Sequence, residues 1–254
     1  MKFRQLPKRQ RIRKTLQFIS FLLLPATLYY FSPMLILQGS WEGVVNGSMI
    51  VFAALFCSSL FLGRLWCGWL CPTGGLQETC LPLNNKPTSR RINWIKWAIW
   101  IPWIGLIAFL AIRAGGYHRI DPFYQIETGV TMALPIDGDG PPWFTIYYVI
   151  VTLFFGLALL VGRLAACHTI CWMAPFMIVG RWIRNRLRWP SLRLCADQSK
   201  CIDCHACTRA CPMSLDVNAL VRSGVMEHSE CALCGECVDT CPKDVIHYTF
   251  SGGK

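Results

Sequence analysis

The sequence between residues 201 and 242 contains eight cysteines in two copies of one spacing. Residues 201–212 read CIDCHACTRACP, and residues 231–242 read CALCGECVDTCP. Each copy is C-x2-C-x2-C-x3-C-P, the run of cysteines that holds [4Fe-4S] clusters in bacterial two-cluster ferredoxins. Two matching runs, each closed by proline, are a specific signal for two such clusters.

In this arrangement, the fourth cysteine of each run binds the cluster of the other run. The ligands predicted for the first cluster are Cys201, Cys204, Cys207 and Cys241. Those predicted for the second are Cys231, Cys234, Cys237 and Cys211. Zinc sites also use C-x2-C pairs, but they take four ligands from two pairs. Residues 201–205 also match the haem-attachment string C-x-x-C-H, although both cysteines already belong to the cluster run.

The composition divides the 254 residues into a largely apolar part and a polar, cysteine-rich end. Lysine and arginine give a formal charge of +11, and they lie at the ends of apolar segments. That placement is typical of membrane proteins, so no nucleic-acid partner is predicted. We predict a transmembrane domain at 1–171 and an amphipathic linker helix on the lipid surface at 172–194. A small α+β ferredoxin domain is predicted at 195–254.

Four apolar segments have the roughly 17–22 residues that cross a bilayer: 16–37, 49–65, 94–112 and 143–161. The predicted fold is therefore a membrane α-helical domain of four spans, with kinks at Pro25 and Pro33. Seven basic residues precede the first segment, whereas the connection 38–48 has none. This asymmetry predicts an inner-membrane protein with both termini and the ferredoxin domain in the cytoplasm. The outward connection 113–142, with its acidic tip at 137–140, is a predicted docking point for an external partner.

A second cysteine pattern lies at the ends of the second and fourth apolar segments. Residues 63–71 read GRLWCGWLC, and residues 162–171 read GRLAACHTIC. Both contain Gly-Arg-Leu followed by Cys-x3-Cys, which indicates an internal repeat of two helix pairs. Cysteines at i and i+4 share one face of a helix, so two such pairs would converge on one site of four sulfurs. These are Cys67, Cys71, Cys167 and Cys171. They are interpreted as ligands of a third iron–sulfur cluster or another metal, or as redox-active dithiols.

Together these motifs resemble those of the NapH/NosR family of membrane polyferredoxins, over residues 15–245. The resemblance implies electron transfer between the quinone pool or a cytoplasmic donor and a partner redox enzyme, with a quinone as a further candidate cofactor. It leaves open whether the chain is an electron-transfer component of a quinol dehydrogenase or of a metal reductase. One departure is that Pro72 follows Cys71 whereas Trp172 follows Cys171, so the two halves are not equivalent.

Two functions fit this sequence. In the first, the chain passes electrons to or from partner proteins, within a hetero-complex, through two ferredoxin clusters and the four-cysteine site. In the second, it is a redox sensor or a maturation factor that supports metal-centre assembly in a partner metalloenzyme. The sequence determines neither the donor nor the direction of electron flow.

Overall fold

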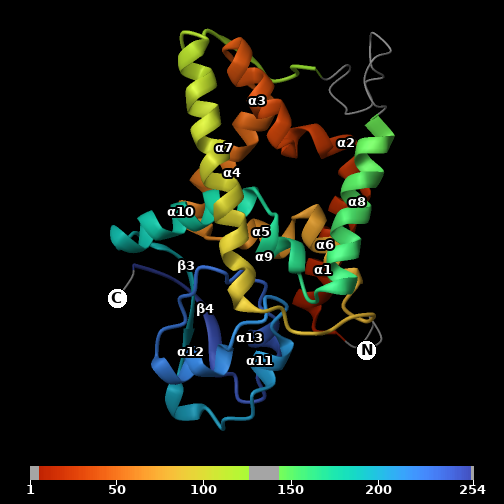
Figure 1. Ribbon diagram of the computed structural model, residues 1–254. Helices are drawn as coiled ribbons and strands as arrows, with labels where there is room; N and C mark the ends of the chain where they lie inside the picture. The colour runs from red at the N-terminus through yellow and green to blue at the C-terminus, as the bar shows by residue number, and fades with distance from the viewer. Residues whose placement is uncertain (1–5, 126–142, 253–254) are drawn as a thin grey trace.

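The computed structural model describes residues 6–125 and 143–252, and it has three levels (Figure 1). Long helices stand at one end, a small unit with both cysteine runs lies at the other, and short helices lie between them. The acidic tip at 137–140 lies outside the described residues.

The N-terminal part of the chain is a broken series of helices. These are α1 (Lys8–Leu22), α2 (Leu24–Thr27), the 3-10 helix η2 (Leu28–Phe31) and α3 (Pro33–Glu42). Pro25 lies in the first turn of α2 and Pro33 begins α3, positions where the missing backbone N–H is not needed. The Ser32 hydroxyl caps α3 by accepting a hydrogen bond from the backbone N–H of Leu35. The two prolines therefore separate helices, where the sequence predicted one kinked span.

The middle of the chain forms two similar series of helices. The first is α4 (Gly47–Leu62), α5 (Leu65–Trp69) and α6 (Pro72–Thr79). The second is α8 (Trp143–Leu160), α9 (Ala165–Thr169) and α10 (Met173–Arg186). Between them lie the 3-10 helix η3 (Arg90–Asn93) and α7 (Trp94–Arg113). A two-stranded parallel pair, β1 (Val44–Asn46) and β2 (Arg119–Asp121), joins the segments that follow α3 and α7.

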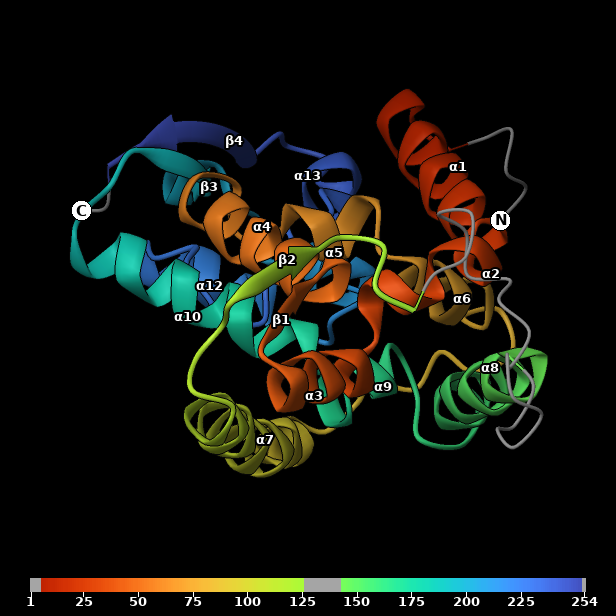
Figure 2. The same cartoon turned by 90° about the horizontal axis from the view of Figure 1, so that it is seen from above.

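The prediction of four membrane-spanning helices is wrong. Among the described residues, one helix, Arg91–Arg113, is long and apolar enough to cross a membrane, judged by length and composition. The apolar helices Gly47–Leu62 and Thr145–Leu160 are shorter. α4 ends early because Gly63 has a φ of 59°, which does not continue a helix. Figure 2 also shows α7 and α8 standing apart, whereas members of a four-helix bundle would pack together.

The C-terminal unit combines a strand pair with short helices. Its elements are β3 (Ser191–Ala196), the 3-10 helix η5 (Gln198–Lys200), α11 (Ala206–Ala210), α12 (Val217–Ser223), α13 (Glu236–Thr240) and β4 (Ile246–Ser251). β3 and β4 pair antiparallel, with Ser191 opposite Ser251 and Ala196 opposite Ile246. Buried Val221, Leu233 and Ile246 contribute to one apolar core that also contains cysteines of both runs. A core this small buries little apolar surface, so bound clusters would add to its stability.

Candidate metal centres

The two cysteine runs have the same backbone conformation. Counted from Cys201 and from Cys231, the residues two, four and thirteen places later all have positive φ. These are Asp203, His205 and Ser214 in the first run, and Leu233, Gly235 and Asp244 in the second. Residues other than glycine rarely adopt a positive φ. Its repetition at equivalent positions therefore indicates that these turns are specific to the cysteine motif. In each run a five-residue helix, α11 or α13, carries the third cysteine and ends just before the fourth.

Each set of four predicted ligands lines its own cavity. One cavity is lined by Cys201, Cys204, Cys207 and Cys241. The other is lined by Cys231, Cys234, Cys237 and Cys211. The fourth cysteine of each run thus lies at the cavity of the other run, which is the arrangement that two-cluster ferredoxins use. Ligation by these eight cysteines stays a prediction.

A zinc ion and a four-iron cluster require different arrangements of thiols. Zinc would need four donors at about 2.0–2.3 Å from one point. Over residues 6–125 and 143–252, no group of three or more His, Cys, Asp or Glu side chains is placed to hold one metal ion. A four-iron cluster is larger than one ion and its ligands lie farther apart, so four thiols around a cavity suit it.

The four other candidate cysteines occupy matching places in the two helix series. Cys67 and Cys167 lie inside α5 and α9, whereas Cys71 directly precedes α6 and Cys171 lies two residues before α10. The backbone N–H of Cys71 donates to the Trp66 carbonyl, and that of Cys171 to the Ala166 carbonyl, each at 3.0 Å. The expectation that each pair shares one helical face is wrong, because α5 and α9 end before the second cysteine. A tight turn at each helix end places the second thiol.

Electrostatic interactions show that these four thiols lie near one another. Burial, and after it the charges of the neighbouring Cys67 and Cys171, raise the pKa of Cys71 to about 12. Burial is also the main cause of the raised pKa of Cys167. The neighbouring Cys171, Cys71 and Cys67 raise this pKa as well. Reactive dithiols instead have a lowered thiol pKa. The surroundings of Cys71 and Cys167 therefore do not activate these thiols in the usual way.

Polar side chains that the sequence analysis did not identify hold this site together. The Gln77 amide nitrogen on α6 donates to the Cys167 sulfur at 3.4 Å, and its amide oxygen accepts from the Ala166 N–H at 2.9 Å. Gln77 thereby ties the first helix series to the second. The Thr73 hydroxyl lies 3.1 Å from the Cys71 sulfur. No sequence motif marks Gln77, because its partners Ala166 and Cys167 lie far away in the chain.

The second cysteine run packs directly against the helix that carries Cys67. A Cβ added at Gly68 would clash with the Ala232 carbonyl oxygen, and it would lie 3.2 Å from the Cys234 Cα. The indole N–H of Trp69 donates to the Leu233 carbonyl at 3.2 Å. The absence of a side chain at Gly68 is therefore what lets the second run approach α5 so closely.

Buried ion pairs also stabilise the contact between the second cysteine run and the helical part of the chain, which is called the junction below. The Glu230 carboxylate lies 2.9 Å from Arg64 and 2.6 Å from Lys96. Burial would raise the pKa of Glu230, but Arg64 and Lys96 outweigh burial and lower it to about 2. Arg13, which is fully buried on α1, pairs with Glu236 at 2.9 Å and also with Glu78. These charged side chains lie directly beside the second run. Each buried positive charge there is paired with a carboxylate, which offsets the cost of removing both from water.

Comparison with known proteins agrees with the cysteine motifs. A family described as a 4Fe-4S binding domain matches residues 47–87, which include Cys67 and Cys71. A family described as a 4Fe-4S dicluster domain matches residues 200–246, which include both runs. No solved structure matches.

Curated relatives cover most of this chain at low identity. An uncharacterized protein of Methanocaldococcus jannaschii, MJ0750, is 25% identical over 260 residues, which is 96% of each chain. The putative electron transport protein YccM of Escherichia coli is 26% identical over 82% of this chain and 57% of its own length. The regulatory protein NosR of Stutzerimonas stutzeri is 26% identical over 78% of this chain and 26% of its own length. With the two matching 4Fe-4S families, these relatives show that the chain resembles the NosR/NapH-type 4Fe-4S proteins, and they support an iron–sulfur protein of electron transfer.

Proposed function

We propose that this chain carries electrons between redox partner proteins at a membrane, through iron–sulfur clusters held by three sets of cysteines. The first cluster has the ligands Cys201, Cys204, Cys207 and Cys241. The second has the ligands Cys231, Cys234, Cys237 and Cys211. The third site has Cys67, Cys71, Cys167 and Cys171. The observation that supports this proposal best is the contact of Gly68 with the second run, which joins the ferredoxin unit to the four-cysteine site.

A bound [4Fe-4S] cluster gains or loses one electron, at a potential set by charge, hydrogen bonds to sulfur and exposure to solvent. The protein contributes different surroundings to the three sets. Cys207, Cys211 and Cys237 are buried in an apolar core, which excludes water from the ligands. Cys71 and Cys171 belong to a second buried cluster with Met173 and Met177.

The first run is where a soluble redox partner would dock. Cys204 is exposed, and the neighbouring Ile202 is 57% exposed. The surrounding side chains include Lys200, Asp203 and His205, all of them about half exposed or more. A short distance between the outermost ligand and a partner's cofactor favours electron transfer, so the exposed first run suits this role.

Membrane association is proposed through one helix and one surface patch. α7 belongs to the one candidate span found among the described residues, and it exposes many apolar side chains, among them Ile101, Phe109 and Ile112. The end of α10 and the residues after it expose Trp182, Leu187 and Trp189 next to exposed arginines. Aromatic and basic side chains together are typical of a segment on an anionic lipid surface.

Metal analysis of anaerobically purified full-length protein tests the proposal. Three clusters would give about twelve irons per chain, and the quadruple serine variant of Cys67, Cys71, Cys167 and Cys171 would retain about eight. The matched control is the double variant Cys57→Ser and Cys80→Ser, which lie in the same half of the chain and should leave iron unchanged. A colourless, iron-free protein would refute the proposal. If the quadruple variant and the unmodified protein contain equal iron, the proposal of a third cluster is refuted and the two ferredoxin clusters are unaffected.

A second candidate function, redox sensing or support of metal-centre assembly, draws its support from one relative. NosR is described as a regulatory protein, and it matches 78% of this chain. A gene deletion distinguishes the two functions. Loss of electron flux with a metal-replete partner enzyme supports electron transfer, whereas intact flux with a metal-deficient partner supports assembly.

A further inference from the structure

The arginines of the two Gly-Arg-Leu repeats both reach segments that carry predicted ligands of the second cluster. Arg64 pairs at 2.9 Å with Glu230, the residue directly before Cys231. The Arg163 guanidinium donates to the Cys211 carbonyl at 3.2 Å. Because Cys231 and Cys211 belong to the same predicted ligand set, both repeats of the helical part hold the second cluster's segments rather than those of the first alone.

The two arginines differ in their surroundings. Arg64 is 1% exposed, and its Nη1 donates to the Ser229 carbonyl at 3.1 Å. Arg163 is half-buried, and it also donates to the Asn85 carbonyl at 2.9 Å. Water screens a charge that it can reach, whereas a charge in apolar surroundings acts more strongly on its neighbours. Of the two, Arg64 is therefore the one whose charge has the larger effect on nearby groups.

Arg64 belongs to a buried group of three charged side chains. It shares the Glu230 carboxylate with Lys96, whose amine lies 2.6 Å from the other carboxylate oxygen. None of the three side chains, which we call the charged triad, is more than 5% exposed. Two cations and one carboxylate leave one net positive charge, and burying such a charge is costly unless another group compensates it. A negatively charged site next to the triad would supply that compensation.

The four-cysteine site lies next to the triad. Arg64 directly precedes α5, the helix that carries Cys67. Burial by itself would lower the pKa of Arg64, but Glu230, Cys67 and Cys171 together raise it. Burial raises the pKa of Cys167 and of Cys171, and Arg64 opposes burial by lowering both. These mutual effects place the Arg64 charge close to three of the four thiols.

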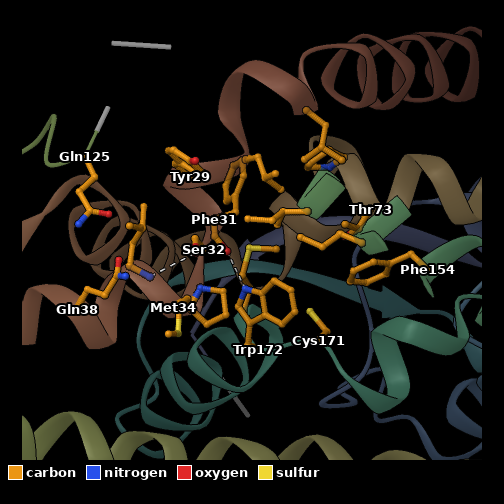
Figure 3. Close-up of a pocket in the computed structure, with 18 residues that line it drawn as sticks. Tyr29, Phe31, Ser32, Met34, Gln38, Thr73, Gln125, Phe154, Cys171 and Trp172 are labelled. Carbon is orange, nitrogen blue, oxygen red and sulfur yellow. Dashed lines mark hydrogen bonds between the residues drawn. The ribbon is translucent and has the colours of Figure 1, made fainter. Parts of the chain in front are cut away.

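Another side of the four-cysteine site is bordered by uncharged groups. Cys171 lines an apolar cavity there, together with Thr73, whose hydroxyl lies 3.1 Å from the Cys71 sulfur (Figure 3). The rings of Phe154 and Trp172 form part of the cavity wall. None of the described residues that line this cavity carries a charge. A change of charge at the four cysteines is therefore not balanced from this side, which leaves the triad to balance it.

We propose that the charged triad raises the reduction potential of the four-cysteine site and so favours the passage of an electron to it from the second run. The inference rests on the proposed function, and it adds the residues that determine where the electron resides. In this step one electron is lost at the second run and one is gained at the four cysteines, and no bond is made or broken.

The triad stabilises the gained electron through its charge. One added electron makes the four-cysteine site more negative by one unit, and the net positive charge of the triad attracts it across surroundings that exclude water. At the second run, Glu230 adjoins Cys231 and opposes the two cations. The triad therefore acts more strongly on the four cysteines than on the second run.

Redox titration of the anaerobically purified full-length protein, followed by EPR spectroscopy, tests the inference. The reduction step that disappears in the quadruple serine variant is assigned to the four-cysteine site. Arg64→Gln and Lys96→Gln each remove the net positive charge of the triad and leave Glu230 with one cation. Each should lower the potential of this step by at least about 59 mV, which is a tenfold change for a one-electron couple. Arg64→Lys keeps the charge and should lower the potential by less than half as much.

Arg163→Gln is the matched control, because it removes the arginine at the equivalent place of the second repeat, where water screens the charge. It should leave the potential of the four-cysteine step unchanged. Iron content is measured on every sample, so the loss of a cluster is distinguished from a shift in potential.

Three results overturn the inference. One is an unchanged potential in Arg64→Gln and Lys96→Gln samples that retain their iron. Another is an equal decrease in Arg64→Lys and Arg64→Gln, because the effect would then follow the shape of the side chain and not its charge. The third is an equal decrease in Arg163→Gln. A quadruple serine variant that titrates like the unmodified protein is a different failure, because it refutes the third cluster of the proposed function itself.

Discussion

The two cysteine runs share one spacing and one backbone, yet they lie in different surroundings. The first run is open to solvent, with Cys204 exposed and Ile202 57% exposed. The second run is enclosed, with Ala232 at 5% and Leu233 at 1% exposure. The motif thus determines how cysteines are arranged around a cluster. The rest of the molecule determines whether that cluster faces a partner or lies inside the protein.

Charged residues of the helical part produce this difference. Arg13, Arg64 and Lys96 all reach carboxylates next to the second run, and none of the three side chains is more than 1% exposed. Beside the first run, the Arg222–Asp203 pair has side chains that are 67% and 48% exposed. Exposed pairs of this kind stabilise a protein little, whereas breaking a buried pair is costly.

The largest expected difference comes from removing one ligand of each cluster. Cys204→Ser should lose about four irons and leave the rest of the fold in place, because Cys204 lies at the surface. Cys234→Ser should lose a similar amount of iron and also unfold the junction, because its run packs against Gly68 and Trp69. Iron analysis combined with limited proteolysis of the segment between α10 and β3 would measure both effects. If the two variants resist protease equally, the second run is no more important to the fold than the first.

A smaller difference is expected from the two ion pairs. Glu230→Gln leaves Arg64 and Lys96 buried without a charged partner, which should cost about 3–5 kcal/mol of unfolding free energy. Asp203→Asn at the first run should cost at most about 1 kcal/mol. Asparagine also tolerates the positive φ of 58° at that position, so the control adds no backbone strain. Chemical unfolding of both variants under anaerobic conditions checks this, and similar midpoints would show that Glu230 is not essential to the junction.

The smallest expected difference concerns a single methyl group. Gly68→Ala places a Cβ against the Ala232 carbonyl and should destabilise the protein by about 1–3 kcal/mol, because backbone atoms must shift. Gly105→Ala on α7 is the control, because its Cβ would meet nothing within 4 Å. Thermal unfolding monitored by cluster absorbance compares them. A Gly68→Ala variant as stable as Gly105→Ala would mean that the second run does not pack tightly on α5.

The failure of the four-span prediction has a physical cause. Hydropathy depends on composition, but the length of a span depends on where each helix ends. Pro25 and Pro33 start new helices inside the first apolar segment, and Gly63 ends α4. The polar side chains of Gln10, Arg13 and Gln17 on α1 are buried against partners elsewhere in the chain, although a polar sequence usually indicates an exposed segment.

The sequence alone determined the local chemistry of this protein. Cysteine spacing predicted two sets of four thiols and their exchange of the fourth ligand, because this depends on short turns that the motif itself specifies. It also singled out the second set of Cys-x3-Cys pairs. Only the tertiary structure decided which run is enclosed, which charges are buried beside it and where an apolar cavity meets the four-cysteine site. Those features depend on contacts between residues far apart in the chain, such as Gly68 with Ala232 and Arg13 with Glu236. Local sequence patterns do not predict such contacts.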